Sequence, residues 1–588
     1  MRFEVWAPFA ATVSVTVEAT SGQRDVDLQP DPVAGTWVGV LADVRHGDRY
    51  RFVLDGGEPL ADPASRWQPD GVHGPSAVVD VRRFTFTDGG WRGIELADAV
   101  FYELHVGTFT PAGTLPAAVS QLPRLAELGV TAVELMPVNA FPGERNWGYD
   151  GVFPSAVQAS YGGPEGLATF VDAAHGHGLA VVLDVVYNHV GPEGSVLGRF
   201  GPYFTDVIRT PWGDAINLAG AGSDTVRRTF VESACHWITD FHVDGLRLDA
   251  VHAFHDPTAL PFLEVLAAAV HDAGAAAGRA VLVIAESSDN DPRLVRAPAA
   301  GGMGCDAVWN DDVHHALRVA LTGDRHGYYI DYDGVGDLAE ALTHRWVLRG
   351  RRSTVRGRRH GRSADDIDCG RFVVFTGNHD QIGNTPAGDR PPYDTRRRLV
   401  AAATIVLSPF TPMLFMGEEY AETAPFPFFV DHGDPELLEA VHQGRRREFS
   451  AAECSGEVAD PASPATFEAA VLNPTLAERE PHRSTLSAYT ELLALRRRHR
   501  ALTASDASQE VTRHGDSLVV RRERAGAGAR AVLVLAFGEG VCTEIDVGAD
   551  LSIEFDASDR RWGGDGAAAT LDRGRLRLDG ITAVLLVG

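Results

Sequence analysis

Charged residues that could take part in catalysis stand at the ends of short apolar runs in this sequence. The run Val243–Leu248 includes Arg247 and leads directly into Asp249, and other runs lead into Glu286 and Asp380. A buried strand normally excludes such charges, so their positions need a reason. An arginine two residues before a carboxylate, on the same face of a strand, can keep that carboxylate ionised and oriented. A structural ion pair is the alternative interpretation of this stretch alone.

Carboxylates that converge on one surface could cleave a glycosidic bond. Hydrolysis of an acetal needs a proton donor for the leaving oxygen and an anionic group beside the oxocarbenium-like carbon. Asp249 lies close to Arg247 in the sequence, so it fits the ionised nucleophile. Glu286 fits the acid, because like-charged neighbours raise the pKa of a buried carboxyl group. Together with Asp380, these residues predict a glycoside-cleaving site.

Metal-assisted hydrolysis is a competing hypothesis. His252 and His255 are three positions apart. A second group of possible ligands consists of Asp311, Asp312, His314 and His315. A zinc site needs about three or four converging ligands, often from an HExxH helix, and the sequence has no such motif. We therefore expect no metal ion and no cofactor.

Apolar runs and amphipathic stretches alternate from about residue 98 to about residue 500. Helix candidates, with apolar residues recurring at helical spacing, are 115–128, 166–175, 225–240 and 394–407. The eight strand candidates are Val100–His105, Ala132–Pro137, Ala180–Tyr187, Val243–Leu248, Ala280–Ala285, Ala307–Trp309, Phe372–Phe375 and Met413–Met416. This alternation predicts an α/β protein with a central (β/α)8 TIM barrel, whose functional residues lie at the C-terminal strand ends.

Shorter alternating runs flank the predicted barrel. Residues 1–95 are typical of an N-terminal β-sandwich, immunoglobulin-like and similar to carbohydrate modules, with turns such as Asp55-Gly56. We expect residues 96–502 to form the barrel, with an insertion at 419–481 that contains a helix-like stretch at 435–443 and with a last helix at 486–499. Residues 503–588 predict a small C-terminal β-domain.

Composition limits the possible partners. The 588 residues carry a formal charge of -27, which argues against a nucleic-acid or acidic-membrane partner. We expect the basic run Arg349–Arg362 to be a solvated loop. The sequence contains no lysine, which excludes Schiff-base chemistry and a Walker-type phosphate loop. Scattered cysteines and the lack of an apolar leader or spanning segment predict a soluble cytoplasmic protein.

Motifs at the predicted strand ends identify a family resemblance. They are DVVYNH from Asp184, GLRLDAV from Gly245, IAES around Glu286 and GNHD ending at Asp380. In this order the chain resembles the α-amylase superfamily of glycoside hydrolases and transglycosidases. The resemblance covers the barrel, and the flanking β-domains also suit that superfamily.

The resemblance implies a role for each matching residue. Asp249 would form a covalent glycosyl enzyme, Glu286 would act first as general acid and then as base, and Asp380 would stabilise the transition state. Tyr149 would stack on the sugar at the cleaved position, and His189 and His379 would form hydrogen bonds with it. Arg247 would orient Asp249.

Further segments narrow the resemblance to maltooligosyltrehalose trehalohydrolases. They are GYDGV at 148, SYGGP at 160, NHVGPEG at 188, FGPYFT at 200, TPWGDAIN at 210, DAVHAFHD at 249, WNDDVHH at 309, HDQIGN at 379 and GEEYAE at 417. The resemblance implies cleavage of the α-1,4 bond beside a terminal trehalose, with related α-glucans as further ligands. It also implies a pathway partner, maltooligosyltrehalose synthase.

Candidate residues for reading the trehalose end are His252, Asn310, Asp311 and His315, although some of them could instead brace loops. Gln381 and Asn384 are further candidate substrate-binding residues. A glycogen branching or debranching enzyme of the same superfamily is the closest alternative. A glucan-binding protein without activity is a more distant one, and it predicts the loss of an essential carboxylate.

Overall fold

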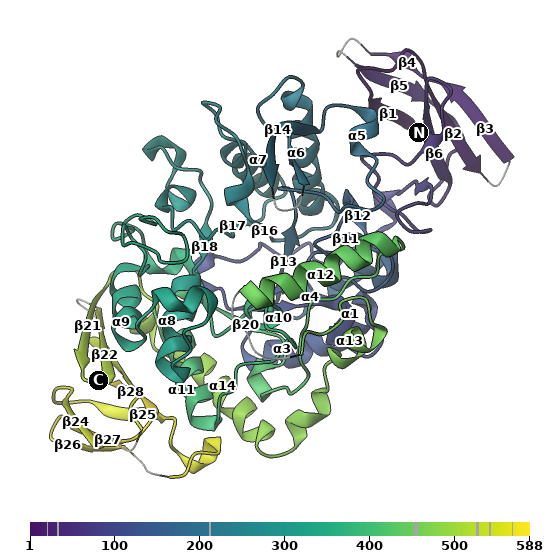
Figure 1. Ribbon diagram of the computed structural model, residues 1–588. Coiled ribbons are helices and arrows are strands. Elements are labelled where there is room, and N and C mark those ends of the chain that lie inside the picture. Colours follow the sequence, from purple (N-terminus) through teal and green to yellow (C-terminus); the bar gives the residue numbers. More distant parts are fainter. Residues whose placement is uncertain are drawn as a thin grey trace.

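A closed parallel barrel forms the centre of the protein (Figure 1). The computed structural model describes residues 1–19, 22–31, 35–210, 213–451, 457–524, 528–539, 542–566 and 569–588. Within these ranges the eight barrel strands, in spatial order, are β9 Phe101–Leu104, β10 Ala132–Leu135, β13 Ala180–Val185, β16 Gly245–Leu248, β17 Leu282–Ala285, β18 Ala307–Trp309, β19 Phe372–Phe375 and β20 Thr411–Phe415. Each predicted strand is confirmed. Pro211 and Trp212 of the TPWGDAIN motif lie outside the described residues.

Helices pack around the outside of the barrel. The longer ones are α4 Gly163–Gly176, α6 Ser223–Asp240, α7 Phe262–Ala276, α8 Asp311–Thr322, α9 Val335–His344, α11 Thr395–Val406 and α14 His482–Arg498. The predicted helix over 115–128 is helical at every residue but is not one continuous α-helix. It is divided into α2 Leu115–Ala118, the 3-10 turn η3 Val119–Gln121 and α3 Leu122–Leu128. Pro123 lies in the first turn of α3, where its missing N–H is tolerated, whereas inside one continuous helix it would remove a hydrogen bond.

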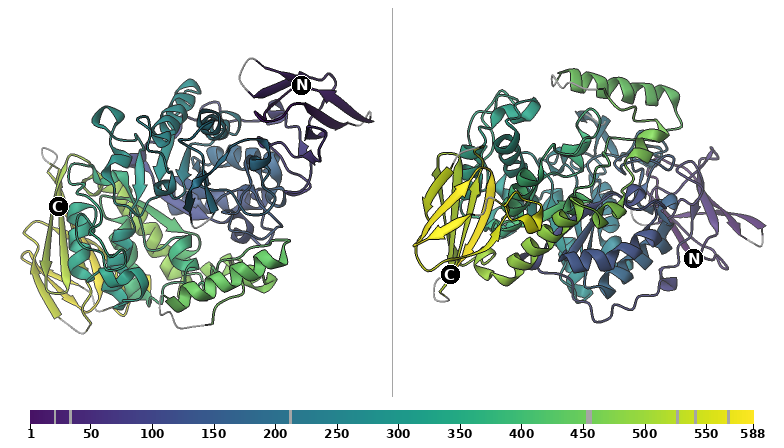
Figure 2. Two further views of the ribbon diagram at one scale, coloured as in Figure 1. Left: turned by 45° about the horizontal axis from the view of Figure 1, so that its top comes forward. Right: turned by 90° about the horizontal axis from the view of Figure 1, so that it is seen from below.

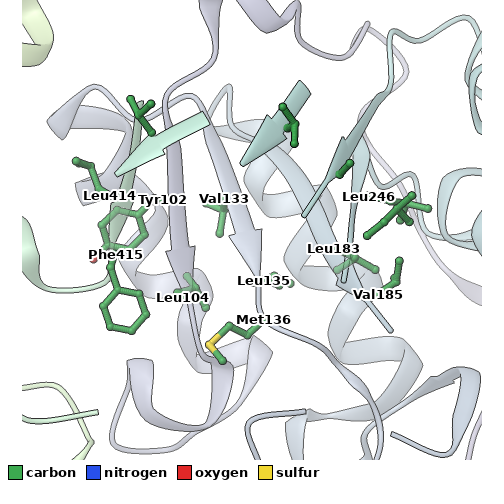
Figure 3. Packing of buried hydrophobic residues seen from close by; sticks show 14 of the residues in the cluster. Tyr102, Leu104, Val133, Leu135, Met136, Leu183, Val185, Leu246, Leu414 and Phe415 are labelled. Atoms are coloured by element: carbon green, nitrogen blue, oxygen red, sulfur yellow. The ribbon is translucent and has the colours of Figure 1, made fainter. Parts of the chain in front are cut away.

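Alternation along each barrel strand separates two apolar surfaces. Side chains such as Tyr102, Val133 and Leu183 pack outwards in the large core cluster (Figure 3). Inward-facing residues form a second cluster, which includes Phe101, Ala132, Val182, Ile284, Val373 and Met413. The next inward positions towards the C-terminal strand ends are ionic, since alternation places Glu103, Glu134, Asp184 and Arg247 there. The barrel interior therefore changes from apolar to charged as it approaches the predicted site.

An antiparallel β-sandwich precedes the barrel. One sheet consists of β1 Arg2–Trp6, β5 Thr36–Val40 and β4 Gln29–Pro30, and the other of β3 Gly22–Asp27, β2 Val13–Ala19, β6 Arg49–Leu54, β7 Pro59–Leu60 and β8 Ser76–Ala77. The predicted turn at Asp55-Gly56 is confirmed, because both residues follow β6 with positive φ angles of 51° and 68°. Glycine adopts this left-handed conformation without the steric cost that a side chain adds.

A second β-domain follows the barrel, at the opposite end from the first (Figure 2). One sheet consists of β21 Ala507–His514, β22 Ser517–Arg524, β23 Ala529–Ala536, β28 Thr582–Val587 and β25 Ser552–Asp556. The other sheet consists of β24 Cys542–Asp546, β27 Arg575–Asp579 and β26 Thr570–Asp572. We propose to divide the chain after residues 95 and 502, since residues 84–95 and 503–506 contain neither helix nor strand beyond an isolated bridge at Gly93.

The insertion after β20 contributes a helix that is longer than predicted. This helix, α12 Pro435–Ala451, crosses in front of the barrel in Figure 1 and lies at the edge of the molecule in the right view of Figure 2. The prediction of a fully solvated loop at 349–362 is wrong in part. His360 is buried and its Nε2 lies 2.7 Å from the Ser288 carbonyl oxygen. No helix among the described residues is long and apolar enough to cross a membrane.

A buried arginine joins the last barrel helix to the end of α11. Arg496, only 7% exposed, donates hydrogen bonds to the carbonyl oxygens of Val406, Ser408 and Phe410 at 2.8, 2.7 and 2.6 Å. These carbonyls lie at the last residue of α11 or just beyond it and have no intrahelical donor, so the guanidinium satisfies them. The contact fixes the approach of the chain to β20.

We predict that Arg496→Met lowers the free energy of unfolding by about 3 kcal/mol, because buried carbonyl groups would lose a charged donor. Calorimetry should show a lower Tm than for the wild type. Arg497→Met is the matched control, since Arg497 is exposed on the same helix. Equal Tm values for the two variants would contradict the prediction.

Candidate active site

A single guanidinium group lies at the centre of the predicted site. Arg247 is fully buried, and its Nη1 donates to both carboxylate oxygens of Asp184 and to Oδ1 of Asp249, each at 2.8 Å. Its Nη2 lies 3.8 Å from Oε2 of Glu286. The Trp309 ring covers the guanidinium, with the ring centroid 4.2 Å from Cζ. One cation therefore contacts carboxylates from the ends of three neighbouring strands, β13, β16 and β17.

Backbone hydrogen bonds hold the two candidate catalytic carboxyl groups side by side. Leu248 of β16 is paired with Ala285 of β17, so the next residues, Asp249 and Glu286, leave the barrel together. The Ala250 N–H donates to Oε2 of Glu286 at 2.6 Å. Ala250 has φ 39° and ψ 52°, a left-handed conformation that is strained for a residue with a side chain and that is concentrated at functional sites.

Glu286 and Asp249 differ in their surroundings. Burial raises the pKa of Glu286, the charges of Asp249 and Asp380 raise it further, and Arg247 opposes the increase. The sequence predicted this direction for the acid. Asp249 accepts hydrogen bonds from Arg247 and from Nδ2 of Asn188, the latter at 2.9 Å. These donors fix the orientation of the Asp249 carboxyl group.

The third carboxylate, Asp380, lies on the short helix α10 His379–Gly383. Asn378 caps this helix, since its side chain accepts from the backbone N–H groups of Asp380 and Gln381. The Asp380 side chain is 46% exposed, whereas that of Asp249 is 12% exposed. Asp380 is therefore more open to solvent, and to a ligand, than the carboxylate at the barrel mouth.

His379 carries a positive charge into the site. Its Nδ1 lies 2.5 Å from Glu103 Oε1, and its Nε2 lies 2.8 Å from the hydroxyl of Tyr149. Burial alone would lower the pKa of His379, but the carboxylates of Glu103 and Asp380 outweigh it and raise that pKa to about 9. The Tyr149 hydroxyl in turn donates to Asp184 at 2.6 Å. A continuous chain of hydrogen bonds thus connects Glu103 to Arg247.

The remaining predicted sugar ligands differ in their accessibility. His189 is buried, with Nε2 3.0 Å from the Tyr149 carbonyl oxygen. His252 is exposed and lies near enough to Glu286 to lower its pKa. Asn310 is fully buried, and its amide donates to the Arg345 carbonyl oxygen at 2.7 Å. Asn310 therefore holds the backbone just after α9.

Asp311 and His315 lie on one turn of α8 at the edge of the site. Burial, followed by the charges of Glu286 and Asp380, raises the pKa of Asp311 to about 8. Gln381 Nε2 donates to Asp311 Oδ1 at 3.1 Å. The ring of His315 lies 4.5 Å from that of Tyr328. Within the described ranges, no three His, Cys, Asp or Glu side chains are arranged to hold a metal ion.

Sequence reasoning missed several residues that support the site. Glu103 and Glu134 are charged residues within buried strands, which is the signal that identified Arg247, but no catalytic motif contains them. Arg445 lies in the polar insertion and carries no local signal. Its partners come from a distant part of the chain.

Arg445 fixes α12 above the site. Its Nη2 and Nη1 donate to Gly383 O and to Asn384 Oδ1, both at 2.8 Å, and Asn384 Nδ2 donates to Asp380 Oδ1 at 3.3 Å. Phe449 is the single buried side chain of α12 among those that the structure describes. Arg445 therefore supplies much of the contact between this helix and α10.

We predict that Arg445→Ala increases hydrogen exchange throughout α12, because the helix would lose its polar attachment to α10 while retaining little apolar contact. Mass spectrometry of peptides from 435–451 measures this change. Arg446→Ala is the control, since Arg446 is exposed on the same helix. Unchanged exchange in Arg445→Ala would show that other contacts hold α12.

Comparisons with known proteins agree with this geometry. The family model for the alpha amylase catalytic domain matches residues 81–199. A protein from Arthrobacter ramosus named malto-oligosyltrehalose trehalohydrolase is 49% identical over 504 residues, which cover 84% of this chain and 87% of that protein. A 1,4-alpha-glucan branching enzyme from Nitratidesulfovibrio vulgaris is 30% identical over 356 residues, covering 53% of this chain and 55% of the enzyme.

A solved structure resembles the whole chain. The crystal structure of a Salmonella typhimurium protein described as an alpha amylase superposes on this chain with a TM-score of 0.88. The two sequences are 35% identical. The match covers 100% of this chain and 97% of that one. The extent of the trehalohydrolase match exceeds that of the branching enzyme. The chain therefore belongs to the malto-oligosyltrehalose trehalohydrolase family of the alpha-amylase superfamily.

Proposed function

We propose that this protein hydrolyses the α-1,4-glucosidic bond next to the terminal trehalose unit of maltooligosyltrehalose and releases trehalose and a shortened maltooligosaccharide. The observation that carries the proposal is the arrangement of Asp249 and Glu286 around Arg247, in a chain of this family. The branching-enzyme relative matches a smaller part of the chain, which favours hydrolysis over branching. Related α-glucans share the bond and would also enter the site.

The mechanism that we propose has two displacements. Asp249 attacks the anomeric carbon of the maltooligosyl part and forms a C–O bond, while the bond from that carbon to the glycosidic oxygen breaks. Glu286 gives its proton to this oxygen, and trehalose leaves. Water then attacks the same carbon and displaces Asp249. Glu286 accepts the proton of that water, so both carboxyl groups return to their starting states and the anomeric configuration is retained.

The surroundings support this division of labour. The raised pKa of Glu286 keeps a proton available, and activity that depends on that proton falls as the pH rises through this pKa. Arg247 orients Asp249 through a hydrogen bond from its Nη1. Asp380, His189 and His379 would bind hydroxyl groups of the sugar at the cleaved position.

Aromatic and amide residues would complete the sugar site. Tyr149 would stack on the sugar, and its hydroxyl, bound to Asp184, fixes the ring plane. Gln381 and Asn384 bind the carboxylates of Asp311 and Asp380, which supports a positioning role for both amides. The trehalose end would be read by Asp311 and His252, which lie near Glu286, together with His315, which lies one turn along α8 from Asp311.

We further propose a cytoplasmic location and a pathway partner. Cys235, Cys305 and Cys369 are free thiols, which is typical of a reducing compartment. Maltooligosyltrehalose must be made from a maltooligosaccharide by a separate activity, which is the role of a maltooligosyltrehalose synthase.

Product analysis tests the proposed substrate. We expect free trehalose as the dominant early product from maltooligosyltrehalose, and much slower cleavage of maltohexaose and of a branched glucan, because the site would read the trehalose end. Chromatography of the three reactions measures this. New α-1,6 branches or rapid debranching without trehalose would overturn the substrate. Proton NMR before mutarotation should show an α-configured reducing end, and a β-configured one would contradict the two-step mechanism.

Substitution of the carboxyl groups tests their roles. Asp249→Ala should abolish turnover, and Glu286→Gln should lower kcat by roughly 10²- to 10⁴-fold, because a general acid contributes that much. Circular dichroism should show an unchanged fold. Glu127→Gln is the control, since Glu127 is exposed on the outer helix α3. Wild-type rates in either site variant would remove that residue from the mechanism.

A further inference from the structure

Glu134 is a buried carboxylic acid that the mechanism above does not use. It lies on an inward-facing position of β10 and is 0% exposed. Neither carboxyl oxygen has a hydrogen-bond partner among the residues that the structure describes. In the parallel register, Glu134 lies directly beside Glu103 of β9. A buried polar group without a partner is costly, so its presence here calls for a function.

The charges that face Glu134 are already paired with other groups. They belong to Glu103 of β9, Asp184 of β13, Arg247 of β16 and His379 of α10. Among these four, His379 is bound by Glu103, and Arg247 is bound by Asp184 and at the strand end by Asp249. No cation of this group is therefore left to neutralise an ionised Glu134. Burial, and then the charge of Glu103, raise the pKa of Glu134 well above its ordinary value.

Arg247 has buried N–H groups that match the free oxygens of Glu134. Its Nε and Nη2 have no hydrogen-bond partner within the described part of the chain. Across the sheet, Glu134 pairs with Val182, and Asp184, two residues further along β13, pairs with Arg247. The backbone of Glu134 thus lies about 7 Å along the strand direction from the level of Asp184 and Arg247, and the Arg247 charge is near enough to lower the pKa of Glu134. Buried polar groups that lie close together without a direct hydrogen bond are commonly joined by ordered water.

We propose that Glu134 is an uncharged positioning residue, which shares an internal water molecule with the Arg247 guanidinium and so keeps that guanidinium on Asp249. The inference rests on the proposed role of Asp249 as nucleophile. An ionised Glu134 would compete with Asp184 and Asp249 for the same cation, and the nucleophile would lose part of its counter-charge. A neutral carboxyl group supports the guanidinium without this competition.

Two substitutions of Glu134 separate its hydrogen bonding from its charge. E134L keeps a side chain of similar size without polar atoms, and kcat should fall about tenfold with KM nearly unchanged, because the orientation of Arg247 would be lost. E134Q keeps a neutral hydrogen-bonding group and is the conservative rescue, so it should recover most of the activity with the wild-type pH profile. Full activity in E134L, or an E134Q as impaired as E134L, would overturn the proposal.

Infrared spectroscopy tests the uncharged state without any substrate. The wild-type-minus-E134Q difference spectrum at neutral pH should contain the carbonyl band of a protonated carboxyl group, shifted in D₂O. A carboxylate band in its place would overturn the proposal, even if E134L does not fold. A high-resolution crystal structure should show a water molecule bonded to both Glu134 and Arg247, and a dry contact would overturn the bridge. A wild-type enzyme that cleaves another α-glucan but yields no trehalose would overturn only the proposed function.

Discussion

The structure depends on one buried cation, the guanidinium of Arg247. It has no solvent to stabilise its charge and lies against the face of Trp309, so the carboxylates of Asp184 and Asp249 must do so. Removal of one partner from such a group leaves an uncompensated buried charge, which is far more costly than the loss of a surface ion pair. The strand ends are therefore held in register by electrostatics as well as by the backbone. The same constraint explains why an arginine, always charged and able to donate in several directions, occupies this position.

The barrel interior below this cation is apolar, whereas the functional side chains lie at the C-terminal strand ends. Its lower inward layer is apolar, for example Phe101, Val182 and Met413, and separates the ionic layer above from the N-terminal end of the barrel. A water-poor environment strengthens each interaction among Glu103, His379 and Arg247. The helices outside the barrel pack against the opposite faces of the same strands. The site is thus positioned by elements whose own packing does not involve it.

Much of this architecture could be predicted from the sequence because parallel strands buried on both faces read as short apolar runs, as at Phe372–Phe375. The carboxylates at the strand ends followed from the same runs. Other features depend on distant contacts. The extension of α12 beyond residue 443 has no apolar periodicity and is held through Arg445. The break before α3 could be recognised only from the position of Pro123 in the first turn of a separate helix. Glu134 could be recognised only when its neighbours in space were known.

The left-handed backbone at Ala250 has a consequence for how such enzymes can diversify. The amide of this residue orients Glu286, while the preceding residue, Asp249, is held by Arg247. The relative placement of the proposed nucleophile and the proposed acid is thus encoded mainly in the main chain and in one interior cation, and hardly in the loops that surround the mouth. The insertion that carries α12 contributes none of these hydrogen bonds and reaches the site through Asn384, which binds Asp380. Substrate preference can therefore change on this scaffold while the placement of Asp249 and Glu286 is kept.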